Sequence, residues 1–548
     1  MTPESLHSAF LELAAFVEQR QLAQNRELWE RQVSRVTGRR TAGPAPEALE
    51  RQVRLFQETE RGIDQHAGCL SQQEARQWRV IRSFFDPYRA PAQSLVRMTK
   101  LLHRIELALS PRAPRAKILP VNRHKRWRCW RGIGNDAARE AAWNACITAD
   151  PQLGEPFAEL VDLRNEVARA LGYADFYEYR LRCDGWIPAD FDRMLDEMDR
   201  ATAAPYERAR TTVDEELARL WKPFPAGTCW QYGDPWVQTA PAFLPNHPAK
   251  WLRPRPELLV QRTFAGLGWT GKYYRQFLPR QASWFPNAFC LHLNRGADIR
   301  IAANLGPDVH SLNLLLHEAG HAVWFAHLDP RLPFLLRTPA HPLLSEGFSM
   351  LMQRLPFMPS WVRATRPGRS TGVLRHERDL RRADWTDRLF FTRWSLALIR
   401  FERAVYAGGG AADLQALYWS MVRRHQGFEM PQGRGDCLDY LSKHHLITHP
   451  ASYHYYLLGM CFASLLTQRL AGVQGHDTDP LDLDLTGRSS VLGLPTAASL
   501  ELGEFLREHL FAPGADCDDP FSFAAKLCGQ QLSTTAFLED LARLEMMS

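Results

Sequence analysis

Long apolar runs are absent from this chain of 548 residues. No stretch approaches the roughly 20 uncharged apolar residues that a membrane-spanning helix needs, so we expect no membrane partner. The first residues also lack the pattern of a signal peptide, because Glu4, Glu12 and Glu18 interrupt the apolar positions and no basic segment precedes them.

Paired cysteines are absent as well. The ten cysteines are scattered, and none forms a C-x-x-C pair. In a long chain, such cysteines are typical of buried thiols in a reducing compartment rather than of a disulfide framework. The pattern predicts a cytoplasmic protein without a thiolate metal site.

A strong charge imbalance is also missing, since the formal net charge is only +6. The densest basic segment, residues 112–131, contains Trp127 and Trp130 among its arginines and lysines. Such a segment can contact nucleic acid or acidic peptides. The plainer interpretation is a solvated face with two packed tryptophans, and we therefore expect no nucleic-acid partner.

Helical periodicity dominates what is present, and we find no internal repeat. The pattern predicts helices at residues 1–36, 49–84, 155–183 with a break at Gly172, and 186–222. Two alternating runs, 288–294 and 298–305, are separated by three residues that include Gly296 and predict a hairpin. The expected fold class is therefore mainly α with a small β-sheet.

Residues 317–321 read HEAGH within an apolar, helix-like segment. On a helix, positions i and i+4 share a face, so His317 and His321 can both bind one metal ion. Glu318 would lie beside the ion, where it can take a proton from an attacking water molecule. This pattern predicts a metal-dependent hydrolase.

A carboxylate stands in a second apolar, helix-like segment, 343–355, at Glu346. Buried histidines and carboxylates are costly without a partner such as a metal ion. Two histidines, one glutamate and one open position form the pattern of a catalytic zinc site, so we predict one Zn²⁺ per chain. The alternative is a pair of satisfied core histidines and a surface glutamate.

Residues 443–459, KHHLITHPASYHYYLLG, are rich in histidine and tyrosine. A hydroxyl or imidazole directed at the oxygen of an attacked carbonyl group stabilises the charge that develops there. Tyr453 and Tyr456 are three residues apart and can share a helix face. A stripe of packed tyrosines is the alternative.

The chain resembles the zinc oligopeptidases related to angiotensin-converting enzyme and thimet oligopeptidase, and most closely the bacterial branch of the angiotensin-converting-enzyme family. The segments that carry the resemblance occur in matching order and include LRNEVARALGYADFYEY (163–179), AFCLHLNRGADIRIAAN (288–304), LLLHEAGHAVW (314–324), LPFLLRTPAHPLLSEGFSMLMQRL (332–355), PASYHYYLLGMCFASLL (450–466) and FAPGAD (511–516). The resemblance implies a mainly α, two-lobed fold around a deep central channel, with a small sheet at the active site.

The same resemblance implies one peptidase unit over 1–548, N-terminal helices at 1–110 covering the channel, and a catalytic core at 280–470 that holds the HEAGH helix. It also implies site roles: zinc binding by His317, His321 and Glu346, general base and acid by Glu318, oxyanion stabilisation by Tyr456, and substrate contacts by Tyr453, Lys443 and His445. Lys443 would pair with the C-terminal carboxylate of the substrate. His449 is a rival to His445, because the histidine match needs a one-residue adjustment.

The chain departs from the family pattern at three positions. Asn287 replaces a histidine just before Ala288, whose strand is expected to pair with an extended peptide through its backbone. Tyr455 replaces an arginine linked to chloride activation, so we expect no chloride dependence. Met350 follows Glu346 by one turn where an acid is usual, so the groups that orient the zinc histidines must come from elsewhere.

The first hypothesis is a zinc metallopeptidase that hydrolyses short peptides, either as a dipeptidyl carboxypeptidase or as an oligopeptidase. Its only expected partner besides another copy is a short peptide, and the protein would be a monomer or a homodimer. The alternative is a catalytically silent or specialised peptide-binding or processing protein that retains this fold. A nucleic-acid binder acting through 112–131 ranks below both.

Overall fold

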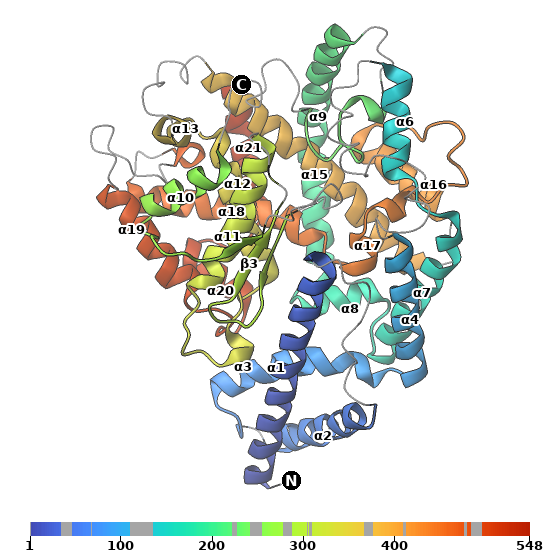
Figure 1. The fold of residues 1–548 in the computed structure, drawn as a ribbon, viewed down its shortest axis with the longest axis vertical. Helices are drawn as coiled ribbons and strands as arrows, with labels where there is room; N and C mark the ends of the chain where they lie inside the picture. Colours follow the sequence, from blue (N-terminus) through green and yellow to red (C-terminus); the bar gives the residue numbers. More distant parts are fainter. Residues whose placement is uncertain are drawn as a thin grey trace.

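Helices make up most of the protein in a computed structural model, as the sequence predicts (Figure 1). The structure describes residues 2–33, 46–66, 68–109, 135–221, 227–241, 255–277, 288–303, 305, 309–365, 376–408, 413–475, 479–483 and 496–548. The basic segment 112–131 and Asn287 lie outside these described residues.

Three N-terminal helices lie together at one end of the long axis: α1 (Pro3–Val33), α2 (Pro46–Gln65) and α3 (Gln72–Phe85) (Figure 1). They share a small apolar core, to which Phe10, Phe56 and Trp78 contribute. Phe334 and Leu335 also belong to this core. The C-terminal part of α1 leaves this core and reaches the sheet, where Asn25 Nδ2 donates to His292 O at 3.1 Å.

The single helix predicted for 49–84 is wrong, because a turn separates α2 from α3. Gly68 adopts a φ of 83° in this turn. Ser71 then caps α3: it accepts from the backbone N–H of Glu74, and Glu74 accepts from the backbone N–H of Ser71. This capping box is a local signal that overrides a continuous helical periodicity.

Five helices form the next section. They are α4 (Ala92–Leu109), α6 (Asp136–Ile147), α7 (Gly154–Ala170), α8 (Phe176–Cys183) and α9 (Pro188–Leu220), and α4 and α6 among them were not predicted from the sequence. The predicted break at Gly172 is confirmed, and its φ of 87° explains why a glycine ends α7. The predicted helix of 186–222 is confirmed as α9, which has Pro188 at its first position.

One small sheet lies beside the HEAGH helix. It contains β1 (Arg275–Phe277), β2 (Phe289–His292) and β3 (Ile299–Ala302) in the order β1-β3-β2. The predicted hairpin is confirmed, since β2 pairs antiparallel with β3 and Cys290 lies opposite Ile301. The parallel strand β1 was not predicted. β2 is left as an edge strand.

The main apolar core surrounds the helices that hold the predicted metal ligands. These helices are α11 (Val309–Ala326) and α12 (Pro342–Arg354). α18 (His454–Gln474) packs against α12, and α15 (Glu377–Gly408) and α21 (Thr535–Met547) pack against α18. The remaining helices are α10 (Pro256–Gly266), α13 (Pro359–Thr365), α16 (Leu414–Gln426), α17 (His445–Thr448), α19 (Ala497–Phe505) and α20 (Pro520–Cys528).

Glycines let α11, α12 and α18 approach one another closely. A Cβ atom on Gly347 of α12 would lie 2.7 Å from Gly459 O of α18, and one on Gly320 of α11 would lie 2.9 Å from Ser349 Cα of α12. Both distances are too short for a side chain. Gly347 directly follows Glu346, so the helix crossing lies at the predicted metal ligand.

The expectation that no stretch approaches a membrane span needs correction for α18, which is long and apolar enough by composition, but its surroundings explain this composition. Its most apolar window has a mean hydropathy of 1.2 and is 72% buried inside the protein. The helix packs against α12, α15 and α21, so most of its faces are apolar.

The crossing of α12 and α18 predicts a stability effect. Gly347→Ala should lower the free energy of unfolding by about 1–3 kcal/mol or more, because the new methyl group overpacks the helix contact. Urea unfolding of the purified protein measures this change.

Gly472→Ala on α18 is the matched control, because a Cβ atom there would meet nothing within 4 Å. It should be neutral or stabilise by up to about 1 kcal/mol, as expected for alanine in a helix. Equal effects of the two substitutions would contradict the importance of the crossing.

Candidate metal centre

The predicted ligands His317 and His321 lie one turn apart on α11 and converge. Their Nε2 atoms are 3.3 Å apart. Glu346 joins them from α12, with its Oε2 atom 3.3 Å from His317 Nε2 and 3.7 Å from His321 Nε2. The predicted convergence of these three side chains is therefore confirmed, and the cluster can hold a metal ion.

The three distances fit a small divalent cation. A tetrahedral ion with bonds of about 2.0–2.1 Å separates its ligand atoms by about 3.3–3.4 Å. Glu346 Oε2 is also buried and has no hydrogen-bond partner among the described residues. Without a cation, it would be energetically unfavourable to bury two facing ring nitrogens together with a carboxylate oxygen that has no hydrogen-bond partner.

The pKa values of the cluster reflect its close charges. Burial alone would raise the pKa of Glu346, but the rings of His321 and His317 hold it well below its usual value. Burial alone would lower the pKa of His317, but its contact with Glu346 raises it. The carboxylate therefore stays ionised and needs a positive partner, which a bound cation would also supply.

Ser345 supplies one of the orienting contacts that Met350 cannot make. Its Oγ atom lies 2.8 Å from His321 Nδ1 and fixes the ring on the side opposite the cluster. His317 Nδ1 is buried without a hydrogen-bond partner in the described part of the chain, although Gln353 approaches the ring. The sequence did not reveal Ser345, because a serine next to Glu346 has no distinctive spacing.

Glu318 lies beside the cluster and outside the ligand set. It is only 6% exposed. Burial raises its pKa, while His317, His321 and the backbone N–H of Cys290 in β2 oppose this rise. A carboxylate with a raised pKa that remains close to a metal cluster is suited to accept and return a proton.

Tyr456 faces the same space from the first turn of α18. Burial raises the pKa of its hydroxyl group, and the charges of Glu346 and Glu318 raise it further, so the group remains a neutral donor. The ring of Tyr453 lies 5.1 Å from that of Tyr456. Tyr453 itself is 3% exposed, and its hydroxyl accepts from Trp394 Nε1 at 2.8 Å.

A buried lysine forms a second polar centre near Tyr453. Lys443 is 7% exposed, and its Nζ atom donates to Gln238 Oε1 at 2.9 Å. The same Nζ atom lies 4.6 Å from the ring of Trp236 and 5.2 Å from that of Tyr453. Gln238 was missed in the sequence, because it is distant along the chain and belongs to an irregular segment.

Both candidate histidines lie near the site: His445 packs against Tyr453 and Tyr456, and the charge of Glu346 affects the pKa of His449. The ring of His445 lies 5.4 Å from the ring of Tyr453 and 5.8 Å from that of Tyr456, and its Nδ1 atom is buried without a hydrogen-bond partner in the described structure. Burial holds its pKa well below the usual value, so the ring is neutral. His449 is exposed and its Nδ1 atom contacts Thr448 Oγ1.

The edge strand β2 offers backbone groups beside the cluster. Ala288 immediately precedes it and is half-buried, whereas Asn287 lies outside the described residues. α1 contacts both ends of β2: Trp29 packs against Phe289, its first residue, and Asn25 Nδ2 donates to the carbonyl of His292, its last.

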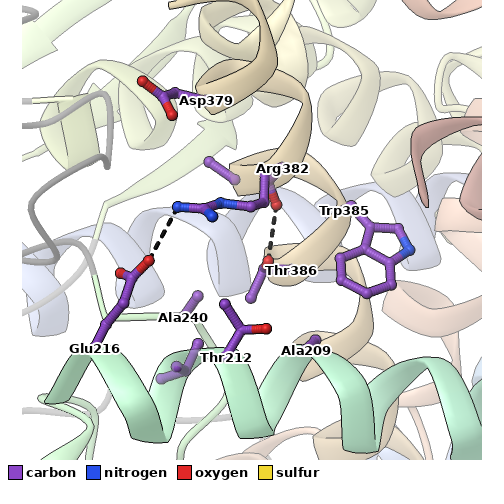
Figure 2. Close-up of a pocket in the computed structure, with 10 residues that line it drawn as sticks. Ala209, Thr212, Glu216, Ala240, Asp379, Arg382, Trp385 and Thr386 are labelled. Atoms are coloured by element: carbon purple, nitrogen blue, oxygen red, sulfur yellow. Dashed lines mark hydrogen bonds and ion pairs between the residues drawn. The ribbon is translucent and has the colours of Figure 1, made fainter. Parts of the chain in front are cut away.

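A separate surface hollow lies between α9 and α15 and shares no residue with the metal cluster (Figure 2). Several of its polar groups already have hydrogen-bond partners. Arg382 donates to Glu216 at 3.0 Å, and Thr386 donates to the Arg382 carbonyl at 2.8 Å. We assign no function to this hollow.

Searches against models of protein families and against characterised proteins found no match to this chain. The geometry of the cluster and its neighbours is therefore the basis for any functional assignment.

The contact of Ser345 with His321 predicts an effect on metal binding. Ser345→Ala should weaken zinc affinity by about 10-fold or more, as is typical when a group that orients a metal-binding histidine is lost. Competition with a chromophoric chelator measures the affinity without reference to activity.

Ser349→Ala is the matched control on the same helix, since the buried Ser349 Oγ atom has no hydrogen-bond partner among the described residues. Its zinc affinity should equal that of the wild type. If Ser345→Ala also leaves the affinity unchanged, the orienting role is wrong.

Proposed function

We propose that this protein is a zinc metallopeptidase that hydrolyses short peptides. The observation that carries the proposal is the convergence of His317, His321 and Glu346 within ligand distance of one another, with Glu318 beside them. Two histidines and a glutamate leave one coordination position open, which is the arrangement of catalytic rather than structural zinc sites.

Zinc bound by these residues would supply a Lewis acid that polarises the substrate carbonyl and acidifies water. Glu318 accepts a proton from the attacking water and later donates it to the leaving amine. Its burial suits both steps, because the raised pKa makes the protonated form accessible. β2 aligns the peptide through its backbone near Ala288.

Tyr456 stabilises the negative charge that develops on the carbonyl oxygen. Its high pKa keeps the hydroxyl protonated, as a hydrogen-bond donor must be. The neutral ring of His445 lies next to Tyr456 and can provide a second polar contact to the substrate.

Lys443 binds the C-terminal carboxylate of the substrate in this proposal. Burial lowers its pKa to about 8, and Asp234 partly opposes the shift. A buried cation among aromatic rings gains considerably from a carboxylate partner. This observation favours release of C-terminal dipeptides over cleavage within longer peptides.

The wider proposal follows the family resemblance: two lobes around a central channel, with α1 near its entrance. The nine cysteines of the described residues are free thiols, which supports a cytoplasmic enzyme. A catalytically silent peptide-binding protein is less well supported, because the general base Glu318 is retained beside intact ligands.

Glu318→Gln should lower kcat/KM on a quenched short peptide by about 100-fold or more, because proton transfer is lost. The zinc content should remain one ion per chain, as measured by elemental mass spectrometry. The exposed Glu429, with 74% of its side chain accessible, provides the control Glu429→Gln, which should retain full activity. Unchanged cleavage by Glu318→Gln would exclude the proposed mechanism.

The role of Lys443 predicts a preference for free C-termini. Wild-type protein should cleave a peptide acid faster than its C-terminal amide, and Lys443→Met should remove the difference by slowing cleavage of the acid alone. Mass spectrometry of the products identifies the dipeptide that is released.

The pH dependence gives a second check on Lys443. Because its lowered pKa is about 8, the ammonium charge is lost as pH rises through this value, and kcat/KM for the peptide acid should fall more than that for the amide. Equal cleavage of acid and amide by the wild type would instead indicate an oligopeptidase.

A further inference from the structure

The segment from His445 to Tyr456 contains several proposed active-site groups, and its middle, residues 449–453, is an irregular turn between two helices. It comprises the short helix α17 (His445–Thr448) and a turn that leads into α18. Short irregular segments keep a fixed geometry only when other parts of the protein hold them. Two buried charged residues from distant helices do so here.

Arg164 of α7 holds the first part of the segment. The side chain is 4% exposed. Its Nη1 atom donates to Leu446 O at 3.1 Å and its Nη2 atom to Ile447 O at 2.6 Å. These contacts fix the carbonyl groups of α17 that the short helix leaves without partners.

Glu402 of α15 holds the second part. It is 3% exposed, and one carboxylate oxygen accepts from the backbone N–H of Ala451 at 2.7 Å. Ala451 is fully buried and has a φ of 52°, a left-handed conformation that is unfavourable for any residue with a side chain. The hydrogen bond therefore stabilises a strained turn directly before Tyr453.

We propose that Glu402 is a positioning residue, whose ionised carboxylate holds the turn at Ala451 and thereby sets the placement of Tyr453 and Tyr456 at the metal centre. This inference rests on the proposed peptidase function. It concerns a residue that contacts neither the metal ligands nor the proposed substrate groups directly.

The surroundings of Glu402 make its charge sensitive to pH. Burial raises its pKa to about 7, although the Ala451 N–H, Arg164 and Arg180 all favour the ionised form. Tyr177 of α8 and Tyr406 of α15 also face the carboxylate. A hydrogen bond to an ionised acceptor is about twice as strong as one to a neutral acceptor, so protonation loosens the hold on the turn.

Glu402→Gln tests the proposal, because glutamine keeps the shape and an acceptor oxygen but does not titrate. The measurement is the ratio of wild-type to variant kcat/KM from pH 5.5 to 8.5. The ratio should be near one at low pH, where Glu402 is protonated, and should rise several-fold with a midpoint near pH 7. Taking the ratio removes the titration of groups that both proteins share.

Glu429→Gln is the control, with 74% of the Glu429 side chain exposed, and its ratio should be flat. A ratio for Glu402→Gln that does not change with pH overturns the positioning role. A wild-type protein that binds zinc but cleaves no peptide contradicts the proposed function instead, so the two failures are distinguishable.

Thermal unfolding tests the titration without any substrate. A carboxyl group whose pKa is raised in the folded state makes the protein less stable as pH rises from its unfolded value toward about 7. The difference between the melting temperatures, variant minus wild type, should therefore increase over this pH range and level off above it. A difference that is the same at all pH values would also overturn the proposal.

Discussion

The close packing of α11, α12 and α18 is the constraint on which the candidate site depends. Gly320 allows α12 to approach α11, and Gly347 and Gly459 allow α12 and α18 to approach each other. Because His317 and His321 extend from α11 and Glu346 from α12, an added methyl group at either crossing would move Glu346 relative to the histidines. Metal geometry tolerates only small displacements, so helix packing and metal binding are parts of the same requirement.

The site concentrates polar and charged groups inside an apolar core, and each of them has a compensating contact. Glu346 lies against two imidazoles, and Lys443 lies against Gln238 and aromatic rings. Buried charges without such contacts would destabilise the fold by several kcal/mol. Within this site, Glu346, His317 and His445 each keep a buried polar atom without a hydrogen-bond partner among the described residues.

A second set of contacts holds the segment that carries the groups proposed to contact the substrate. Arg164 and Glu402 come from α7 and α15, far from the HEAGH helix along the chain, and both bind backbone groups of the segment before α18. This arrangement separates the candidate metal cluster, whose side chains lie on α11 and α12, from the placement of Tyr453 and Tyr456. Under the proposal, a change in the ionisation of Glu402 can therefore alter the placement of Tyr453 and Tyr456 without moving the metal cluster.

The sequence alone determined the features that arise from local spacing. The HEAGH helix, the glutamate-bearing helix, the hairpin before them and the break at Gly172 all follow from residues a few positions apart, since periodicity and glycine act locally. The capping box at Ser71 was also local, but the longer helical pattern concealed it. Only the tertiary structure decided the contacts of Ser345, Gln238 and Glu402, because each depends on elements that are distant in the chain and meet through packing. The sequence contains no signal for such contacts, as a buried serine, glutamine or glutamate has many possible partners until the helices are in place.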